Sequence, residues 1–293
     1  MNVLNCQLHG VVGLRNAPRP GPTVIDCSQP VPWKSDDDSE DTAADDASGA
    51  AAEKADESTM EAPSCPSPVA AAPTIVVKCN DRSDCTTDIQ AAMDSHASTV
   101  TIPSVPQSTW IVQPLLLRAN QRVILQPGVT LQAKTGSFHG KLDSIFSTIH
   151  PGEPQYRVCN SAIIGYGAQL VMNQAEYINT DNYSRAEWRS GITLDAVVNV
   201  SVLGLKISRT GGDGIIVTGN GRSSWSENVV LADLTVDSAY RNALSVISAM
   251  NLTVSNCTLS YAGKDLGTRP MAGEHCFPMP TSLYANLPPV RDH

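Results

Sequence analysis

A repeat within residues 189–265 constrains the fold of this chain more than any other feature of its sequence. Asn199, Asn228 and Asn251 each open a segment in which apolar residues recur at offsets +1, +3, +6 and +8. Such alternation is the pattern of a half-buried strand, and the break between +3 and +6 predicts a bend. The spacing from Asn228 to Asn251 gives a unit of 23 residues, and the preceding unit has six more around 219–226. Strands repeating at this interval, without helical patterns between them, predict a solenoid of parallel strands.

The repeat divides the chain into three parts. Residues 1–73 are rich in Pro, Asp, Ala and Ser and lack apolar periodicity, so we expect a disordered acidic tail. Residues 74–273 are predicted to form a parallel β-helix domain that is incomplete. A helix over about 86–96, N-capped by a threonine, is expected to cover its open end. Residues 274–293 contain four prolines and no alternation, which predicts an irregular tail outside the repeat.

The charge distribution argues against one class of partner. All of the net charge of −9 lies in 34–61, which holds eleven acidic and two basic residues. The remainder is neutral, whereas nucleic-acid binding requires a basic face. No run of 18 apolar residues is present, so no membrane span is predicted. The oligomeric state is left open.

The cysteines and the N-terminus leave the cellular compartment undecided. Cys79 and Cys85 are close enough in sequence to bridge a short loop, and Cys257 occupies an inward repeat position. No CxxC pair occurs, which argues against zinc. Four Asn-x-Ser/Thr sequons would suit a secreted protein, yet strands and their corners are rich in these residues, and residues 1–21 lack a secretory apolar core.

Several stretches resemble a known superfamily. Residues 84–93 resemble the N-terminal cap of pectate-lyase-like proteins, which have the pectin lyase fold, a right-handed parallel β-helix. Residues 123–134 resemble their first coil. Residues 211–215 and 240–249 resemble coils of the right-handed β-helix repeat subgroup. The resemblance covers 74–273 and implies an all-β solenoid with a short capping helix. It does not fix the activity, because the superfamily includes lyases, hydrolases, epimerases and proteins without known activity.

The same subgroup provides an expectation for the C-terminus. Its Gly-Thr-x-Pro-x-Ala-Gly motif, matched by residues 267–273, is typically followed by Ile-Asp, an acidic-Pro pair and further coils. Here Glu274 and His275 follow instead. The resemblance therefore implies a β-helix that is truncated at its C-terminus.

The repeat aligns one corner of successive coils, where we expect the chemistry to lie. Arg189, Asp213 and Arg241 lie one or two residues before the strands predicted to start at 191, 214 and 243, and stacked strands are about 4.8 Å apart. We call these three the corner column and predict them as catalytic residues. Aromatic faces beside charged groups suit an acidic sugar chain, so a polysaccharide is the predicted partner. The residues predicted to bind this polysaccharide are Asn242, Trp188, Tyr183 and Tyr177.

The reaction type remains open at this point. Hydrolysis needs two carboxyl groups, and residues 212–215 resemble the polygalacturonase motif Asn-Thr-Asp-Gly-Ile. However, Arg241 and Asn242 stand where that family has Gly-Asp-Asp, and its Gly-His-Gly is absent. β-Elimination needs a base and a cation, for which Arg189 or Arg241 are candidates. The alternatives are a non-catalytic glycan-binding or structural solenoid, in which the corner column is a self-compensating charge ladder, and an inactive fragment.

No cofactor and no metal are predicted. Calcium could be held by Asp213 together with Asp195 or Asp237. Three scattered carboxylates are, however, fewer oxygen ligands than a calcium site needs.

Overall fold

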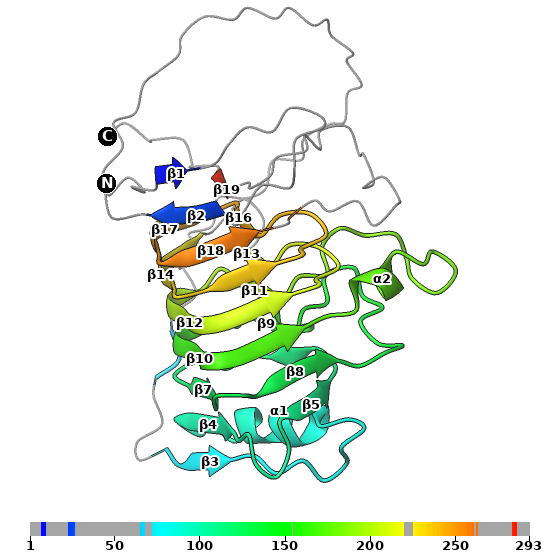
Figure 1. Cartoon of the computed structure of the whole chain (residues 1–293). Coiled ribbons are helices and arrows are strands. Elements are labelled where there is room, and N and C mark those ends of the chain that lie inside the picture. Colours follow the sequence, from blue (N-terminus) through cyan, green and yellow to red (C-terminus); the bar gives the residue numbers. More distant parts are fainter. Residues whose placement is uncertain are drawn as a thin grey trace, which may run out of the picture.

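The computed structural model describes residues 7–9, 23–26, 65–67, 72–153, 155–219, 225–260, 262 and 283–285. The chain winds into a stack of coils, and each complete coil contributes one strand segment to each of three ladders (Figure 1). Strands of neighbouring coils pair in parallel, as β10 with β12 and β11 with β13. The predicted parallel β-helix is therefore confirmed, with the right-handed crossovers that parallel strands adopt.

The three ladders are named in chain order. Ladder 1 contains β3 (Thr74–Val76), β4 (Thr99–Ile102), β7 (Arg122–Leu125), β14 (Ser226–Ala232), β17 (Ala249–Ser255) and the first halves of β10 (Cys159–Val171) and β12 (Val198–Ser208). Ladder 2 contains β5 (Thr109–Val112), β8 (Thr130–Ala133), the second halves of β10 and β12, β15 (Thr235–Asp237) and β18 (Cys257–Ser260). Ladder 3 contains β6 (Leu115–Leu116), β9 (Phe146–Ser147), β11 (Ile192–Asp195), β13 (Ile215–Thr218), β16 (Leu244–Val246) and β19 (Leu283–Ala285).

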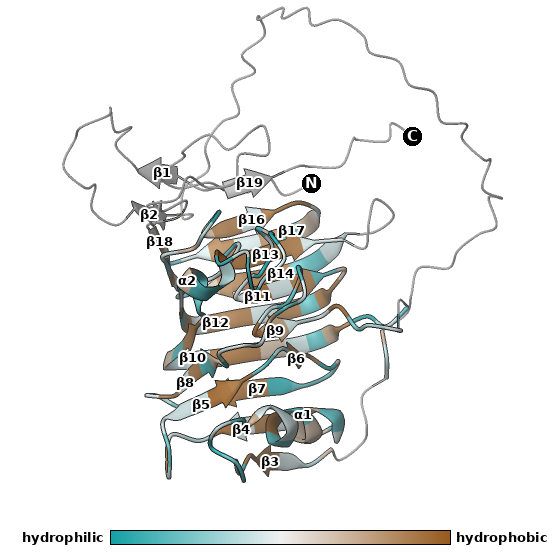
Figure 2. Ribbon diagram, turned by 90° about the vertical axis from the view of Figure 1, so that its right-hand side faces the viewer, coloured by the Kyte–Doolittle hydropathy of each residue, from teal (hydrophilic) through white to brown (hydrophobic). Residues whose placement is uncertain are grey.

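The strand register reproduces the sequence repeat. Val200 pairs with Val229, which pairs with Leu252 on the next coil. Their side chains point inward and are at most 8% exposed, so the alternating apolar positions form the core. Figure 2 shows these apolar strands stacked through the body of the molecule. The six extra residues before Asn228 do not disturb the stack, because β14 still pairs in register with β12.

The repeated asparagines form a ladder of their own. Each has a positive φ of 53° to 56° at a corner of the coil, a conformation that asparagine tolerates. The side-chain amide of Asn199 donates to Asn160 at 3.0 Å, and that of Asn228 donates to Asn199 at 3.0 Å. Because Asn251 donates to Asn228 in the same way, the amides satisfy one another along the stack. Their role is structural.

Helix α1 (Thr86–Asp94) lies at the β3 end of the stack (Figure 1), as predicted for a cap, and buries Ile89, Ala92 and Met93. The predicted threonine N-cap is wrong, because the helix begins at Thr86 and the cap position is Cys85. The Thr86 hydroxyl accepts a hydrogen bond from the Gln113 backbone N–H instead.

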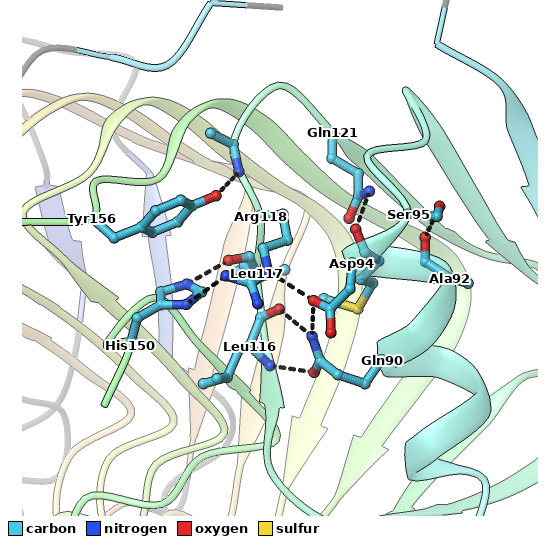
Figure 3. A network of polar contacts seen from close by, with 12 residues as sticks. Gln90, Ala92, Asp94, Ser95, Leu116, Leu117, Arg118, Gln121, His150 and Tyr156 are labelled. Carbon is cyan, nitrogen blue, oxygen red and sulfur yellow. Dashed lines mark hydrogen bonds and ion pairs between the residues drawn. The ribbon is translucent and has the colours of Figure 1, made fainter. Parts of the chain in front are cut away.

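A polar network ties this helix to the strands (Figure 3). The Arg118 Nε donates to Asp94 of α1 at 2.8 Å, and Gln90 bonds both backbone groups of Leu116. His150 completes the network: its Nε2 lies 2.7 Å from the Leu117 carbonyl and its Nδ1 lies 3.0 Å from Arg118. Since Arg118 can only donate, Nδ1 accepts and the imidazole is neutral.

This network should make the stability of the fold sensitive to acid. Burial lowers the pKa of His150 from its ordinary value, which is about 6.5 in an unfolded chain. The unfolded chain then binds more protons, so the contribution of His150 is complete above about pH 6.5 and is lost as pH falls through the lowered pKa. We expect the urea midpoint of the wild type to fall between about pH 7.5 and pH 5.5 by more than that of His150→Gln. Equal pH dependence of the two proteins would contradict this assignment.

The N-terminal part of the chain has one disulfide and two strands that were not predicted. The predicted Cys79–Cys85 disulfide is present, and a second one joins Cys65 to Cys159 of β10. Within 1–73, predicted to be disordered, β1 (Gln7–His9) and β2 (Thr23–Asp26) form an antiparallel pair, and β2 adds to the edge of β18. That edge offers unpaired backbone groups, which a strand can satisfy without belonging to the repeat.

The predicted irregular C-terminal tail needs one correction. Residues 283–285 form β19, which pairs in parallel with β16, because a three-residue strand at a sheet edge needs no long alternating pattern. The acidic run at 34–61, the motif at 267–273 and the predicted truncation lie outside the described residues.

Candidate functional site

The predicted corner is formed by three stacked coils at the start of ladder 3. The backbone N–H of Gly191 donates to the Asp213 carbonyl at 3.1 Å, and that of Gly214 donates to the Asn242 carbonyl at 2.8 Å. Gly212 lets the chain pass close to the preceding loop, since a Cβ there would lie 2.5 Å from the Glu187 carbonyl oxygen. The backbone of the corner column is therefore in the predicted register.

Asp213 and Arg241 form a buried, two-pronged ion pair. The Arg241 Nε donates to Asp213 Oδ1 at 2.8 Å and its Nη2 donates to Oδ2 at 2.5 Å. The Asp213 side chain is fully buried, whereas that of Arg241 is 23% exposed. The Asn242 backbone N–H also donates to Oδ1, at 3.1 Å. Asp213 thus holds the guanidinium of Arg241 in one orientation at the surface.

Arg189 does not join this pair. Its guanidinium is fully buried and donates to the carbonyl oxygens of Phe138, His139 and Ser184 at 2.7 to 3.2 Å. It also lies 5.4 Å from the centre of the Tyr183 ring. The predicted three-membered column is wrong at this position, because the side chain turns to the loops at 136–143 and 173–188, where carbonyl groups accept from its Nε and Nη2 while Nη1 is buried without a partner. Arg189 fastens these two loops together.

The predicted aromatic wall is also only partly present. Tyr177 and Tyr183 are 4% and 3% exposed, so they pack inside the loop and do not offer their faces to a ligand. The Tyr183 hydroxyl donates to Glu176 at 2.6 Å, in helix α2 (Gln174–Tyr177). Trp188, in contrast, is 43% exposed and remains a candidate ligand platform beside the corner. Asn242 donates its side-chain amide to Ser245 at 3.0 Å.

Glu187 is the functional candidate that the sequence did not reveal. One of its carboxyl oxygens, Oε1, is buried without a hydrogen-bond partner. Burial raises its pKa, while the nearby Arg241 lowers it and the nearby Asp213 raises it. The corner therefore combines a carboxyl group whose pKa burial raises with a buried aspartate whose two oxygens are bound by an arginine. Glu187 lies in an insertion outside the repeat, and its position two residues before Arg189 was the only available signal.

The described residues show no sign of a metal centre. No cluster of three or more His, Cys, Asp or Glu residues in this part of the chain could hold an ion. Of the three carboxylates considered for calcium, Asp213 is engaged by Arg241 and Asp237 accepts a hydrogen bond from Ser260 at 3.2 Å. Burial raises the pKa of the third, Asp195. None of the described helices is long and apolar enough to cross a membrane.

Comparison with known proteins gives limited matches. No family model matches the chain. The uncharacterized protein YclG of Bacillus subtilis (strain 168) is 32% identical over 114 residues, which are 36% of this chain and 20% of that protein. The chain thus matches about a fifth of the length of this curated relative.

Three similar solved structures are distant in sequence from this chain. An iota-carrageenase complexed to iota-carrageenan fragments is 18% identical with a TM-score of 0.48, and the match covers 65% of this chain and 42% of that one. A putative glycosyl hydrolase from Parabacteroides merdae is 14% identical with a TM-score of 0.47 over 62% of this chain and 80% of that one. A polygalacturonase from Erwinia carotovora is 14% identical with a TM-score of 0.44 over 69% and 65%. The assignment of a parallel β-helix rests on the chain's own strand pairing.

Proposed function

We propose that this protein acts on an acidic polysaccharide bound across the corner formed by Glu187, Trp188 and Arg241. The supporting observation is the placement of a carboxyl group with a raised pKa beside an arginine whose orientation a buried aspartate fixes. A fixed, partly exposed guanidinium suits the carboxylate or sulfate groups of an acidic glycan. An exposed indole suits the apolar face of a sugar ring.

Each side chain then has a distinct role. Arg241 binds an acidic group of the chain, and Asp213 acts as a positioning residue for Arg241 rather than as a catalytic one. Trp188 supports a neighbouring sugar. Arg189 holds the loop that carries Trp188 and Glu187, so it too acts through other residues.

Glu187 is the proposed proton donor. Its protonated carboxyl group would give its proton to the glycosidic oxygen as the bond from that oxygen to the sugar carbon breaks. A water molecule then adds to the sugar carbon and returns a proton, so the net reaction is hydrolysis. An elimination instead needs a base to remove the proton next to the uronate carboxylate, and it differs from hydrolysis in leaving an unsaturated product.

The second candidate function is glycan binding without cleavage. It is favoured by the engagement of both Asp213 oxygens with Arg241, which leaves that carboxylate poorly placed to activate water. The two candidates predict the same binding surface and differ only in whether products form.

A panel of acidic polysaccharides tests the proposal. Polygalacturonate, alginate and carrageenans would be incubated with the protein, with new reducing ends and unsaturated products measured separately. We expect new reducing ends from at least one of them, and affinity for it about tenfold lower in Arg241→Gln. Arg122→Gln, which changes an exposed arginine of β7, is the matched control. Retention without products would support the binding function, and a panel without binding or products would refute both.

A further inference from the structure

A polar hollow lies at the bend between ladder 1 and ladder 2, away from the corner column. Gly128, Gly167 and Gly204 occupy this bend on successive coils with φ of 87°, 76° and 72°, and Asp233 continues the line with φ of 58°. The missing side chains leave a hollow of about 360 Å³, within the usual size of ligand sites. A Cβ at Gly204 would lie 2.5 Å from the Tyr166 ring, so that ring lies directly over the bend.

One wall of the hollow is formed by Gln169, Lys206 and Thr235, and Thr130 continues this row of polar side chains along the solenoid axis beyond the lining. Thr130 pairs with Gln169, Gln169 with Lys206, and Lys206 with Thr235, each on the next coil. Neighbouring members are therefore about 4.8 Å apart. The Gln169 amide donates to the Thr130 hydroxyl at 2.9 Å, which orients both groups. The row offers donors and acceptors at a regular interval to an extended ligand.

The other side of the hollow carries a fixed carboxylate. The Tyr166 hydroxyl donates to Asp233 Oδ2 at 2.6 Å, and the Asn256 amide donates to Oδ1 at 2.7 Å. The Tyr166 hydroxyl lowers the pKa of Asp233, so the carboxylate is charged at neutral pH. Tyr166 itself is 51% exposed and presents its ring beside the hollow.

The chemistry of the lining selects one ligand class. Asp233 and Lys206 are the charged residues of the lining, and their opposite charges leave it with no net charge. The Asp233 carboxylate would repel a polyanion. The hydroxyl groups of an uncharged ligand can instead donate to Asp233 and accept from Lys206 and Gln169. The side chains of Val129, Ala168 and Leu205 are buried in the core, so the surface beside the polar row is the exposed ring of Tyr166, and an aromatic ring next to polar groups suits sugars.

We propose that this hollow binds an uncharged glycan chain lying along the solenoid axis. The site goes beyond the proposed function, because it lies on another corner of the coil and takes a neutral ligand. A protein that holds a neutral glycan here and an acidic one at the corner column would join two components of a mixed polysaccharide matrix.

Titration with neutral oligosaccharides tests this site. Trimers and hexamers of β-1,4-glucan, β-1,4-galactan and β-1,4-mannan would be added to the whole protein in a calorimeter. We expect one series to bind, the hexamer more tightly than the trimer, and Lys206→Gln to weaken the hexamer about tenfold. Asp233→Asn should do the same, since asparagine tolerates the same positive φ. Lys141→Gln, at another exposed lysine, should bind as the wild type does.

Several results would overturn the site. Absence of binding by every neutral hexamer would do so, as would equal affinity of the wild type and Lys206→Gln. Loss of neutral binding in Arg241→Gln would place the ligand at the corner column instead. Because Arg241→Gln tests the acidic polysaccharide separately, failure of one proposal is distinguishable from failure of the other.

Discussion

Replacement of Glu187 by Gln is expected to lower the turnover of an acidic polysaccharide by about 100-fold or more, with binding changed by less than about threefold. Gln keeps the size and polarity of the side chain but cannot release a proton. Initial rates of reducing-end formation at saturating substrate measure the effect, and calorimetry with a resistant oligosaccharide measures the binding. The loss should appear in kcat and not in the dissociation constant.

The pH profile distinguishes this role from a structural one. Because burial raises the pKa of Glu187, the wild type should keep the required proton to a higher pH than an ordinary Glu, and kcat should fall as pH rises through that pKa. The small residual activity of Glu187→Gln should lack this decline. Glu227→Gln in β14, the matched control, should behave as the wild type. Full turnover by Glu187→Gln would contradict the assignment of the proton donor.

Replacement of Arg189 by Met should give the largest loss of stability among single changes at the site, about 3 to 5 kcal/mol. Met retains much of the volume of the side chain but donates no hydrogen bonds. The carbonyl groups of Phe138, His139 and Ser184 would then lose their shared donor inside the protein. Urea unfolding followed by circular dichroism measures the change.

The loop itself offers a control for this change. Arg185 lies in the same loop as Arg189 but is exposed, so Arg185→Met should shift the free energy of unfolding by no more than about 0.5 kcal/mol. An Arg189→Met protein that unfolds at the wild-type urea concentration would show that the buried guanidinium does not hold the loops together. The result bears on function too, because these loops carry Glu187 and Trp188.

The sequence repeat was sufficient to predict the body of the fold. Inward positions of a parallel β-helix recur at fixed offsets, so Val200, Val229 and Leu252 could be aligned before their pairing was known. The predicted bend is also confirmed, at Gly204 and Asp233, five residues after Asn199 and Asn228. Within the corner column, the same alignment brought Asp213 and Arg241 together.

The repeat could not predict the parts of the site that lie in insertions. Arg189 has the correct backbone position, but its long side chain follows the carbonyl groups of loops that have no counterpart on other coils. Tyr177 and Tyr183 were expected to face a ligand because aromatic faces beside charged groups suit an acidic sugar chain. They pack against Arg189 instead, and this folding of the loop onto itself depends on contacts between distant residues.

Hydrogen–deuterium exchange with a bound acidic oligosaccharide tests the central claim most directly. Hexamers of galacturonate, mannuronate and sulfated carrageenan would each be added to the protein, and peptide exchange would be compared with that of the free protein. A binding hexamer is predicted to protect residues 185–190 and 240–243 and to leave 128–132 and 167–170 unchanged. Protection confined to the second pair of segments, or none at the first, would contradict the placement of the acidic polysaccharide at Glu187 and Arg241.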